Sequence, residues 1–195
     1  MVTEDKNQFG VFLDRDGTLI KSLIIAGKPI AISRIEDFEY IPNVIESTKK
    51  LREIGTSLFM VTNQPDVGRG KTSLHTALEI NKRIINDLVI DDYLMSISEI
   101  NQSEFPRPKP FPDMILYLMN KHRLLPGNCF MVGDRWKDIE AGNEASVHTI
   151  YINSPYRENH PINASFEVSS FAAAVEVIID RIRHIPMSIE VSYED

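Results

Sequence analysis

The sequence has almost no cysteine, no long apolar run and no excess of basic residues, and each absence excludes a class of protein. Its single cysteine, Cys129, has no partner for a disulfide within the chain. One cysteine and five scattered histidines give no spacing typical of a zinc site. No apolar run approaches the roughly 20 residues that cross a bilayer, and residues 1–8 lack the apolar segment of a secretory signal. We therefore expect a cytoplasmic protein with no zinc and no membrane partner.

The net charge and the length of the chain indicate which partners and how many domains to expect. A net charge of −7 argues against a nucleic-acid partner, because such partners need a basic face. A length of 195 residues suits one domain with a sizeable core. We expect a polar tail at 1–8, one domain at 9–185 and a C-terminal tail at 186–195, which alternates like an edge strand but is equally compatible with disorder. For the assembly, we expect a monomer or a small homo-oligomer.

Short apolar runs alternate with longer segments of helical spacing, which is typical of a parallel sheet covered by helices on both faces. We expect strands at residues 9–13, 57–61, 93–97, 129–132, 147–152 and 166–168. We expect helices at residues 42–55, from 72 or 73 to 88, 111–122, 139–145 and 170–184. Residues 21–40 fit no regular pattern and are open to interpretation as a loop, a hairpin or a flap. The sequence therefore predicts an α/β protein with a doubly wound parallel sheet.

Two of these helices have an expected apolar face. The first, opened by Pro42, is expected to bury Val44, Ile45, Thr48 and Leu51. The second, capped by Thr72 or Ser73, is expected to bury Leu74, Leu78, Ile84, Ile85 and Leu88.

Polar residues stand directly after the predicted strands, where parallel sheets bind their ligands. They are Asp14 and Asp16 after the first strand, Thr62 to Gln64 after the second, Lys109 beyond the third, and Asp134 with Asp138 after the fourth. Each alone is explained by a turn, a helix cap or a solvated surface position. Together they are expected to meet in one crevice.

The chemistry of that set points to phosphoryl transfer. Crowded carboxylates need a cation, and all-oxygen ligands suit Mg²⁺. A carboxylate such as Asp14 can be the nucleophile that accepts a phosphoryl group. The metal and Lys109 would offset the repulsion between the two anions. Asp16 is well placed to protonate the leaving oxygen and then to deprotonate the attacking water.

The segments FLDRDGT, VTNQ, KPFP and VGDRWKD, in this order, resemble the four motifs of the haloacid dehalogenase superfamily of phosphatases. The resemblance implies a Rossmann-like domain in which Asp14 is the nucleophile and Asp16 the acid and base. It implies that Asp14, the backbone carbonyl of Asp16 and Asp134 ligate Mg²⁺, with Asp138 acting through water or from farther away. Thr62 and Lys109 would hold the phosphoryl group.

DRDGT and TNQPDVGRG are similar to a narrower group, which contains the bacterial heptose bisphosphate and histidinol-phosphate phosphatases. For the substrate this implies contacts from Asn63 and Gln64, with Arg15, Arg69 and Arg107 as further candidates. Many heptose bisphosphate phosphatases carry a zinc loop of three cysteines and a histidine before the motif lysine. Here that stretch, YLMSISEINQSEFPRPKP, has neither residue type, and Pro108 replaces the arginine that precedes the lysine in that group. We therefore expect no zinc.

The spacing of the four segments leaves no room for a separate cap domain, so we expect loops such as residues 21–40 to cover the site. The leading interpretation is a Mg²⁺-dependent phosphatase of a small phosphorylated metabolite, such as a heptose bisphosphate. Three alternatives stay open. They are a histidinol-phosphate phosphatase, a polynucleotide 3′-phosphatase and a domain that binds phosphate or a partner without turnover.

Overall fold

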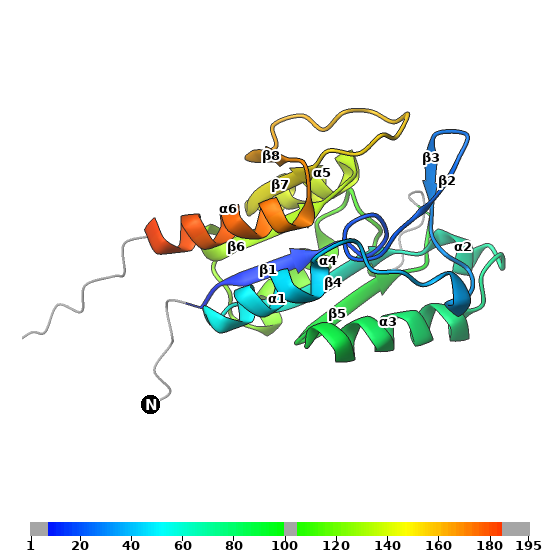
Figure 1. Ribbon diagram of the computed structural model, residues 1–195, viewed down its shortest axis with the longest axis horizontal. Coiled ribbons are helices and arrows are strands. Elements are labelled where there is room, and N and C mark those ends of the chain that lie inside the picture. Colours follow the sequence, from blue (N-terminus) through cyan, green and yellow to red (C-terminus); the bar gives the residue numbers. More distant parts are fainter. Residues whose placement is uncertain (1–7, 100–104, 185–195) are drawn as a thin grey trace, which may run out of the picture.

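Figure 1 shows a parallel sheet between two layers of helices in the computed structural model, which describes residues 8–99 and 105–184. The strands lie in the order β5-β4-β1-β6-β7-β8, and every neighbouring pair is parallel. Their bounds are Gly10–Leu13 for β1, Ser57–Asn63 for β4, Asp92–Ser96 for β5, Cys129–Gly133 for β6, His148–Ile152 for β7 and Phe166–Val168 for β8. The predicted α/β parallel sheet is confirmed, with strand ends within two residues of those expected.

Helices cover both faces of the sheet (Figure 1). Their bounds are Val44–Glu53 for α1, Pro65–Gly68 for α2, Leu74–Leu88 for α3, Asp113–Lys121 for α4, Trp136–Glu144 for α5 and Phe171–His184 for α6, with short 3₁₀ turns at Ile35–Asp37 and Pro126–Asn128. The short α2 follows β4 directly and was not expected from the sequence.

The strand β1 divides the core into its two halves. Successive side chains of a strand point to opposite faces. Val11 and Leu13 pack in the cluster that contains α1, α3 and α6, whereas Phe12 packs in the cluster with α4 and α5. All four residues of β1 are buried, as expected for a central strand covered on both faces.

The predicted apolar faces of two helices were partly wrong. In α1, Val44, Thr48 and Leu51 are buried, but Ile45 is 42% exposed. Pro42 precedes this helix rather than opening it, because Asn43 at the N-cap has a left-handed backbone.

In α3, Ser73 is the cap, and its hydroxyl accepts a hydrogen bond from the backbone N–H of Thr76. Leu74 and Leu78 are exposed. Ile84 and Leu88 are buried as expected, and Ile85 is half-buried. The other buried positions are Ala77, Ile80 and Asn81. The helix is therefore rotated so that the amide of Asn81 points into the protein.

The segment left open in the sequence, residues 21–40, contains an antiparallel hairpin of β2 (Leu23–Ile25) and β3 (Lys28–Ile30). The hairpin stands beyond the carboxyl ends of the central strands, near α2 (Figure 1). At its tip Gly27 has φ +79°, and its carbonyl accepts a hydrogen bond from the backbone N–H of Arg157 at 2.8 Å. The hairpin and the loop 153–161 therefore meet over the same end of the sheet.

The structure describes little of the two predicted tails. Most of the predicted tails, 1–7 and 186–195, lies outside the described residues. Among the residues that are described, no helix is long and apolar enough to span a bilayer.

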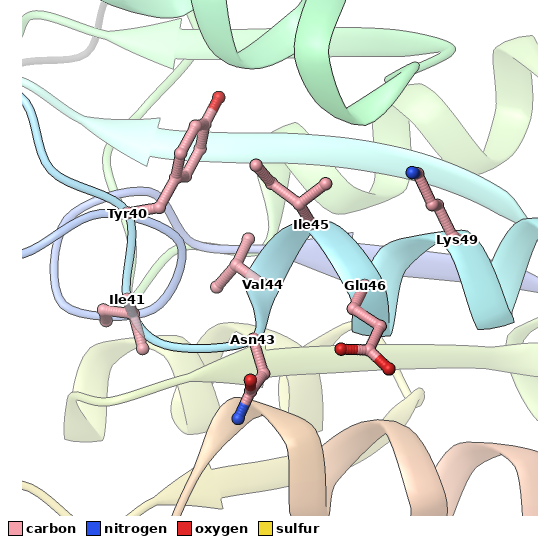
Figure 2. A pocket seen from close by; sticks show the side chains of 7 residues that line it. All are labelled: Tyr40, Ile41, Asn43, Val44, Ile45, Glu46 and Lys49. Atoms are coloured by element: carbon pink, nitrogen blue, oxygen red, sulfur yellow. The ribbon is translucent and has the colours of Figure 1, made fainter.

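A hollow of about 300 Å³ lies at the start of α1, as Figure 2 shows. It is lined by Tyr40, Ile41, Asn43, Val44, Ile45, Glu46 and Lys49. None of these belongs to the polar set that follows the strands, so this hollow is not the candidate site.

Candidate active site

The fold brings Asp14 to the carboxyl end of the central strand. Its backbone N–H donates to the carbonyl of Val132 in β6 at 3.0 Å, which continues the sheet pairing by one residue. Only 6% of Asp14 is exposed to solvent. The first candidate residue is thus fixed by the sheet itself.

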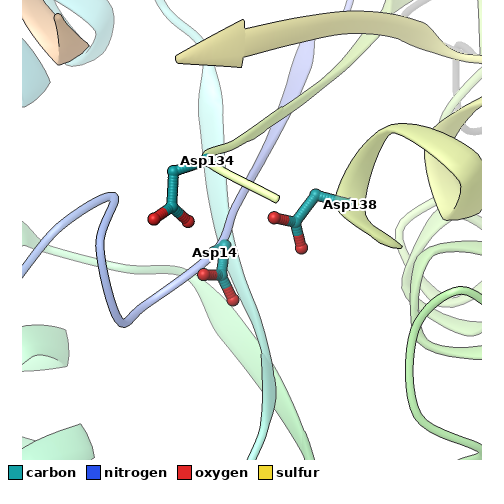
Figure 3. Close-up of side chains that lie close together, drawn as sticks. All are labelled: Asp14, Asp134 and Asp138. Carbon is teal, nitrogen blue, oxygen red and sulfur yellow. The ribbon is translucent and has the colours of Figure 1, made fainter. Parts of the chain in front are cut away.

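Asp134 and Asp138 join Asp14 in one acidic cluster. Each offers a carboxylate oxygen, and these three atoms lie within 4.8 Å of one another. Figure 3 shows the carboxylates side by side, coming from the end of β1, from the turn after β6 and from the first turn of α5. Asp138 also caps its own helix, since its Oδ2 accepts from the backbone N–H of Arg135 at 3.0 Å.

Two glycines make room for this cluster. A Cβ atom on Gly133 would lie 2.3 Å from the side chain of Asp138. A Cβ atom on Gly17 would lie 1.9 Å from Oδ2 of Asp134, and Gly17 has φ +92°, which other residues rarely adopt. Both positions therefore require glycine for the carboxylates to pack this closely.

Lys109 lies between the carboxylates. Its ammonium group is 2.5 Å from Oδ1 of Asp14 and 2.7 Å from Oδ1 of Asp138, and it donates to the carbonyl of Val61 at 2.8 Å. Only 2% of the lysine is exposed. The lysine predicted from the third strand end thus meets the other strand ends in the same place.

Asn63 holds the backbone of this lysine. Its side-chain amide donates to the carbonyl of Lys109 at 2.8 Å, and its Oδ1 accepts from the N–H of Lys109 at 2.9 Å. Because both bonds go to one residue, they fix the position and the direction of the loop that carries the lysine.

Asp16 is held on one oxygen only. Its Oδ2 accepts from Nε of Arg15 at 2.8 Å and from the amide of Gln64 at 2.6 Å. The same amide donates to the hydroxyl of Thr62 at 2.9 Å. Oδ1 of Asp16 is buried and receives no hydrogen bond from the residues that the structure describes.

The crowded charges shift the protonation of the cluster. Burial, followed by the nearby charges of Asp138 and Asp16, raises the pKa of Asp14 to about 6, although Lys109 opposes this. Burial and the charges of Asp14 and Asp138 also raise the pKa of Asp134 well above its ordinary value. For Lys109, burial lowers the pKa, but Asp138 and Asp14 outweigh it and leave the pKa raised.

The residues present fit a divalent cation with oxygen ligands. Oδ2 of Asp134 is buried beside the Tyr156 hydroxyl, yet no group of the described residues donates to it a hydrogen bond of good geometry. A buried oxygen without a donor is costly unless a cation or water binds it. Three carboxylates without cysteine or histidine are a donor set that suits Mg²⁺ rather than zinc.

A cavity of about 470 Å³ opens above Asp14, between the strand ends and the β2–β3 hairpin. Of the predicted substrate contacts, Asn63, Gln64 and Arg69 line it. Arg15 and Arg107 do not line it. Arg15 is fully buried and donates to Oδ1 of Asn81 in α3 at 2.9 Å, besides its bond to Asp16.

Arg107 has an equally complete set of partners elsewhere. It donates to Asp113 through Nε at 2.8 Å and through Nη2 at 2.6 Å, and its guanidinium lies 4.2 Å from the centre of the Phe111 ring. Arg107 and Arg15 would reach a substrate only by leaving these partners.

Several residues of the site were not expected from the sequence. Lys28 and Lys137 line the cavity, as do Arg135 and Glu158, whose side chains pair at 2.9 Å. Arg135 and Lys137 stand within VGDRWKD, so their segment was recognised although their role was not. Glu158 lies in a loop with no periodic pattern, and no signal in the sequence identifies it.

The chain is similar to known proteins over most of its length. The family model described as haloacid dehalogenase-like hydrolase matches residues 27–152. A D-glycero-beta-D-manno-heptose-1,7-bisphosphate 7-phosphatase of Yersinia pestis is 27% identical over 196 residues, covering 94% of this chain and 96% of that protein. A phosphoglycolate phosphatase of Vibrio vulnificus is 29% identical over 141 residues, covering 71% of this chain and 56% of that protein.

Among solved structures, a D,D-heptose 1,7-bisphosphate phosphatase from B. bronchiseptica, complexed with magnesium and phosphate, has a TM-score of 0.76. It is 17% identical, and the match covers 89% of this chain and 99% of that chain. At this identity the likeness supports the fold alone.

Proposed function

Since the chain belongs to the family of haloacid dehalogenase-like hydrolases, we propose that it is a Mg²⁺-dependent phosphatase that hydrolyses a phosphate ester of a small sugar. The single observation that supports this most strongly is the convergence of Asp14, Asp134 and Asp138 around one point, with Lys109 in contact with two of them. The curated relatives that act on heptose bisphosphate favour a sugar phosphate as substrate.

In the first proposed step, a carboxylate oxygen of Asp14 attacks phosphorus and the bond from phosphorus to the ester oxygen breaks. Asp16 donates its proton to that oxygen, so that the sugar leaves as an alcohol. The products of this step are an aspartyl phosphate on Asp14 and an ionised Asp16.

In the second step, Asp16 removes a proton from water as the water oxygen attacks phosphorus. The bond from phosphorus to Asp14 breaks, which releases inorganic phosphate and restores both carboxyl groups. Oδ1 of Asp16 is suited to carry the proton in both steps, because Oδ2 is engaged by Arg15 and Gln64.

The remaining residues hold charge in place. Lys109 keeps the nucleophile oriented and offers a positive charge to the phosphoryl oxygens. Asp14, the backbone carbonyl of Asp16 and Asp134 would hold Mg²⁺, with Asp138 beside them. When bound, Mg²⁺ supplies Lewis-acid stabilisation of the charge on the transferring group. Asn63 and Gln64 line the cavity on the β4 side, whereas Thr62 is buried and accepts a hydrogen bond from the Gln64 amide.

The test is hydrolysis of p-nitrophenyl phosphate. We expect phosphate release that requires Mg²⁺, stops on addition of EDTA and is lost in Asp14→Asn, because an amide is a far weaker nucleophile than a carboxylate. Asp37→Asn is the matched control, since Asp37 is exposed and neither belongs to the acidic cluster nor lines the cavity. Activity that survives in Asp14→Asn at more than about a hundredth of the wild-type rate would contradict the proposal.

A further inference from the structure

The cavity above Asp14 has a different charge from the rest of the molecule. The chain carries a net charge of −7, but the basic residues that line the cavity outnumber the acidic ones. The basic residues are Lys28, Arg69, Lys71, Lys109, Arg135 and Lys137, and the acidic ones are Asp14, Asp16, Asp66, Asp138 and Glu158. Binding of Mg²⁺ would add two further positive charges, so the loaded cavity favours a ligand with more than one negative charge.

Most of these basic side chains already have a carboxylate partner. The pairs are Lys109 with Asp14 and Asp138, Arg69 with Asp66 and Glu99, Lys71 with Asp66 at 4.0 Å, and Arg135 with Glu158. Lys28 and Lys137 are different, because neither side chain makes a hydrogen bond or an ion pair within residues 8–99 and 105–184. They are therefore the cations that a bound anion can reach without displacing a partner.

Lys137 is the more informative of the two. An exposed lysine such as Lys28 is solvated and needs no partner, whereas Lys137 is half-buried. Its ammonium group lies 5.6 Å from the centre of the Trp136 ring. Glu158 and Asp138 act on its charge from a distance, but no carboxylate of the described residues forms an ion pair with it. A partly buried charge without a counter-ion is unfavourable, and an anion in the cavity would relieve that cost.

A chain of contacts links the segments that carry the two lysines, both of which line the cavity. Lys28 follows Gly27, whose carbonyl is bonded to the N–H of Arg157. The next residue, Glu158, pairs with Arg135, which lies two positions before Lys137. The hairpin, the loop 153–161 and the start of α5 are thus joined, and the two free ammonium groups belong to this joined frame.

We propose that Lys137, assisted by Lys28, binds an anionic group of the substrate that is not cleaved. The inference rests on the phosphatase function proposed above and narrows it to substrates that carry a second phosphate or a carboxylate. It disfavours phosphate esters whose remote end carries an amine, such as histidinol phosphate, since two ammonium groups would then repel the substrate.

The experiment measures inhibition of p-nitrophenyl phosphate hydrolysis by fructose 1,6-bisphosphate and by fructose 6-phosphate. In the wild type we expect the inhibition constant of the bisphosphate to be about tenfold lower than that of the monophosphate, because one charge-assisted hydrogen bond contributes about that factor to affinity. Lys137→Met should raise the constant for the bisphosphate about tenfold and that for the monophosphate by less than about threefold. Lys137→Arg, which keeps the charge, should retain the difference.

Lys82→Met is the matched control, because Lys82 is an exposed lysine of α3 that does not line the cavity. It changes the net charge of the protein by the same amount as Lys137→Met but should leave both inhibition constants unchanged. The control therefore distinguishes a local effect of Lys137 from a general effect of net charge. The inference about Lys137 would be overturned if the two sugars had equal inhibition constants in the wild type, or if Lys137→Met raised both constants by the same factor. Either result would leave the proposed phosphatase function untouched. A wild type that does not hydrolyse p-nitrophenyl phosphate with Mg²⁺ would overturn the proposed function and this inference with it.

Discussion

The floor and the roof of the cavity are built in opposite ways. We define the floor as Asp14, Lys109 and Asp138, and the roof as the hairpin 23–30 with the loop 153–161. The floor side chains are almost fully buried and touch one another, whereas Leu23, Ile24 and Ile25 of the roof are 44%, 54% and 57% exposed.

The difference teaches that the two parts have different tasks. Packed charges at strand ends keep their geometry, as a reaction at phosphorus requires. Exposed segments held by few hydrogen bonds can vary without disturbing that geometry, so they suit the choice of substrate. We therefore expect changes in the floor to lower kcat and changes in the roof to alter KM.

The largest effect is expected from Lys109→Met. The substitution removes the ammonium group that contacts Asp14 and Asp138, and so leaves two carboxylates facing each other beside the incoming phosphate. We expect kcat for p-nitrophenyl phosphate to fall about 10³-fold, as for loss of one preorganised charge-stabilising group. Steady-state kinetics in saturating Mg²⁺ measures this.

The matched control is Lys121→Met, which removes an exposed lysine that is 2.7 Å from Asp92 at the beginning of β5. Its kcat should stay at the wild-type value. A fall in kcat of less than about tenfold in Lys109→Met, or a rise in KM with kcat unchanged, would contradict the prediction. The floor would then not be the part of the site that sets the rate.

A smaller loss of kcat is expected from Asn63→Ala. The side chain of Asn63 makes two hydrogen bonds to the backbone of Lys109, the residue whose ammonium group contacts Asp14. Without them the loop can shift, and a displacement of about 1 Å costs up to about 100-fold in rate. We expect kcat to fall by between about tenfold and 100-fold.

Asn120→Ala is the control for this loss, because Asn120 is exposed on α4. The thermal unfolding midpoints of both variants show whether a loss of fold accompanies the loss of rate. An Asn63→Ala enzyme with wild-type kcat would mean that the loop is positioned without these bonds, and that the floor extends less far than we infer.

The same division explains what the sequence could predict. The floor residues follow buried strands, and because parallel strands align their carboxyl ends, their meeting could be inferred from the order of elements alone. The partners of Arg15 could not be inferred in this way. Its bond to Asn81 joins residues 66 positions apart and turns the polar side of α3 inward, which is why Leu74 and Leu78 were wrongly expected in the core.

The roof was largely beyond prediction. Residues 21–40 have the residue types of a hairpin, but nothing in a single sequence indicates that Gly27 meets Arg157, which is 130 positions later (27 to 157). Glu158 likewise has no local pattern that marks it as the partner of Arg135. Contacts between irregular segments far apart in the chain are set by the completed fold, not by local periodicity.

The smallest effect is expected where hairpin and loop meet, at Gly27. A Cβ atom here would lie 2.8 Å from the side chain of Arg157, and the φ of +79° is unfavourable for alanine by about 1 kcal/mol. Gly27→Ala should therefore loosen the roof while the floor is unchanged. We expect KM for a sugar bisphosphate to rise about threefold, the equivalent of less than 1 kcal/mol, with kcat within a factor of about two of the wild type.

Gly55→Ala separates this contact from backbone strain. Gly55 has nearly the same backbone angle, φ +80°, but lies at the end of α1 with no atom within 4 Å of the added Cβ. Both variants should lose a similar amount of stability in chemical denaturation, and only Gly27→Ala should change KM. A fall in kcat for Gly27→Ala as large as that for Asn63→Ala would show that the roof also sets the geometry of the reacting groups, and the separation of tasks would then be lost.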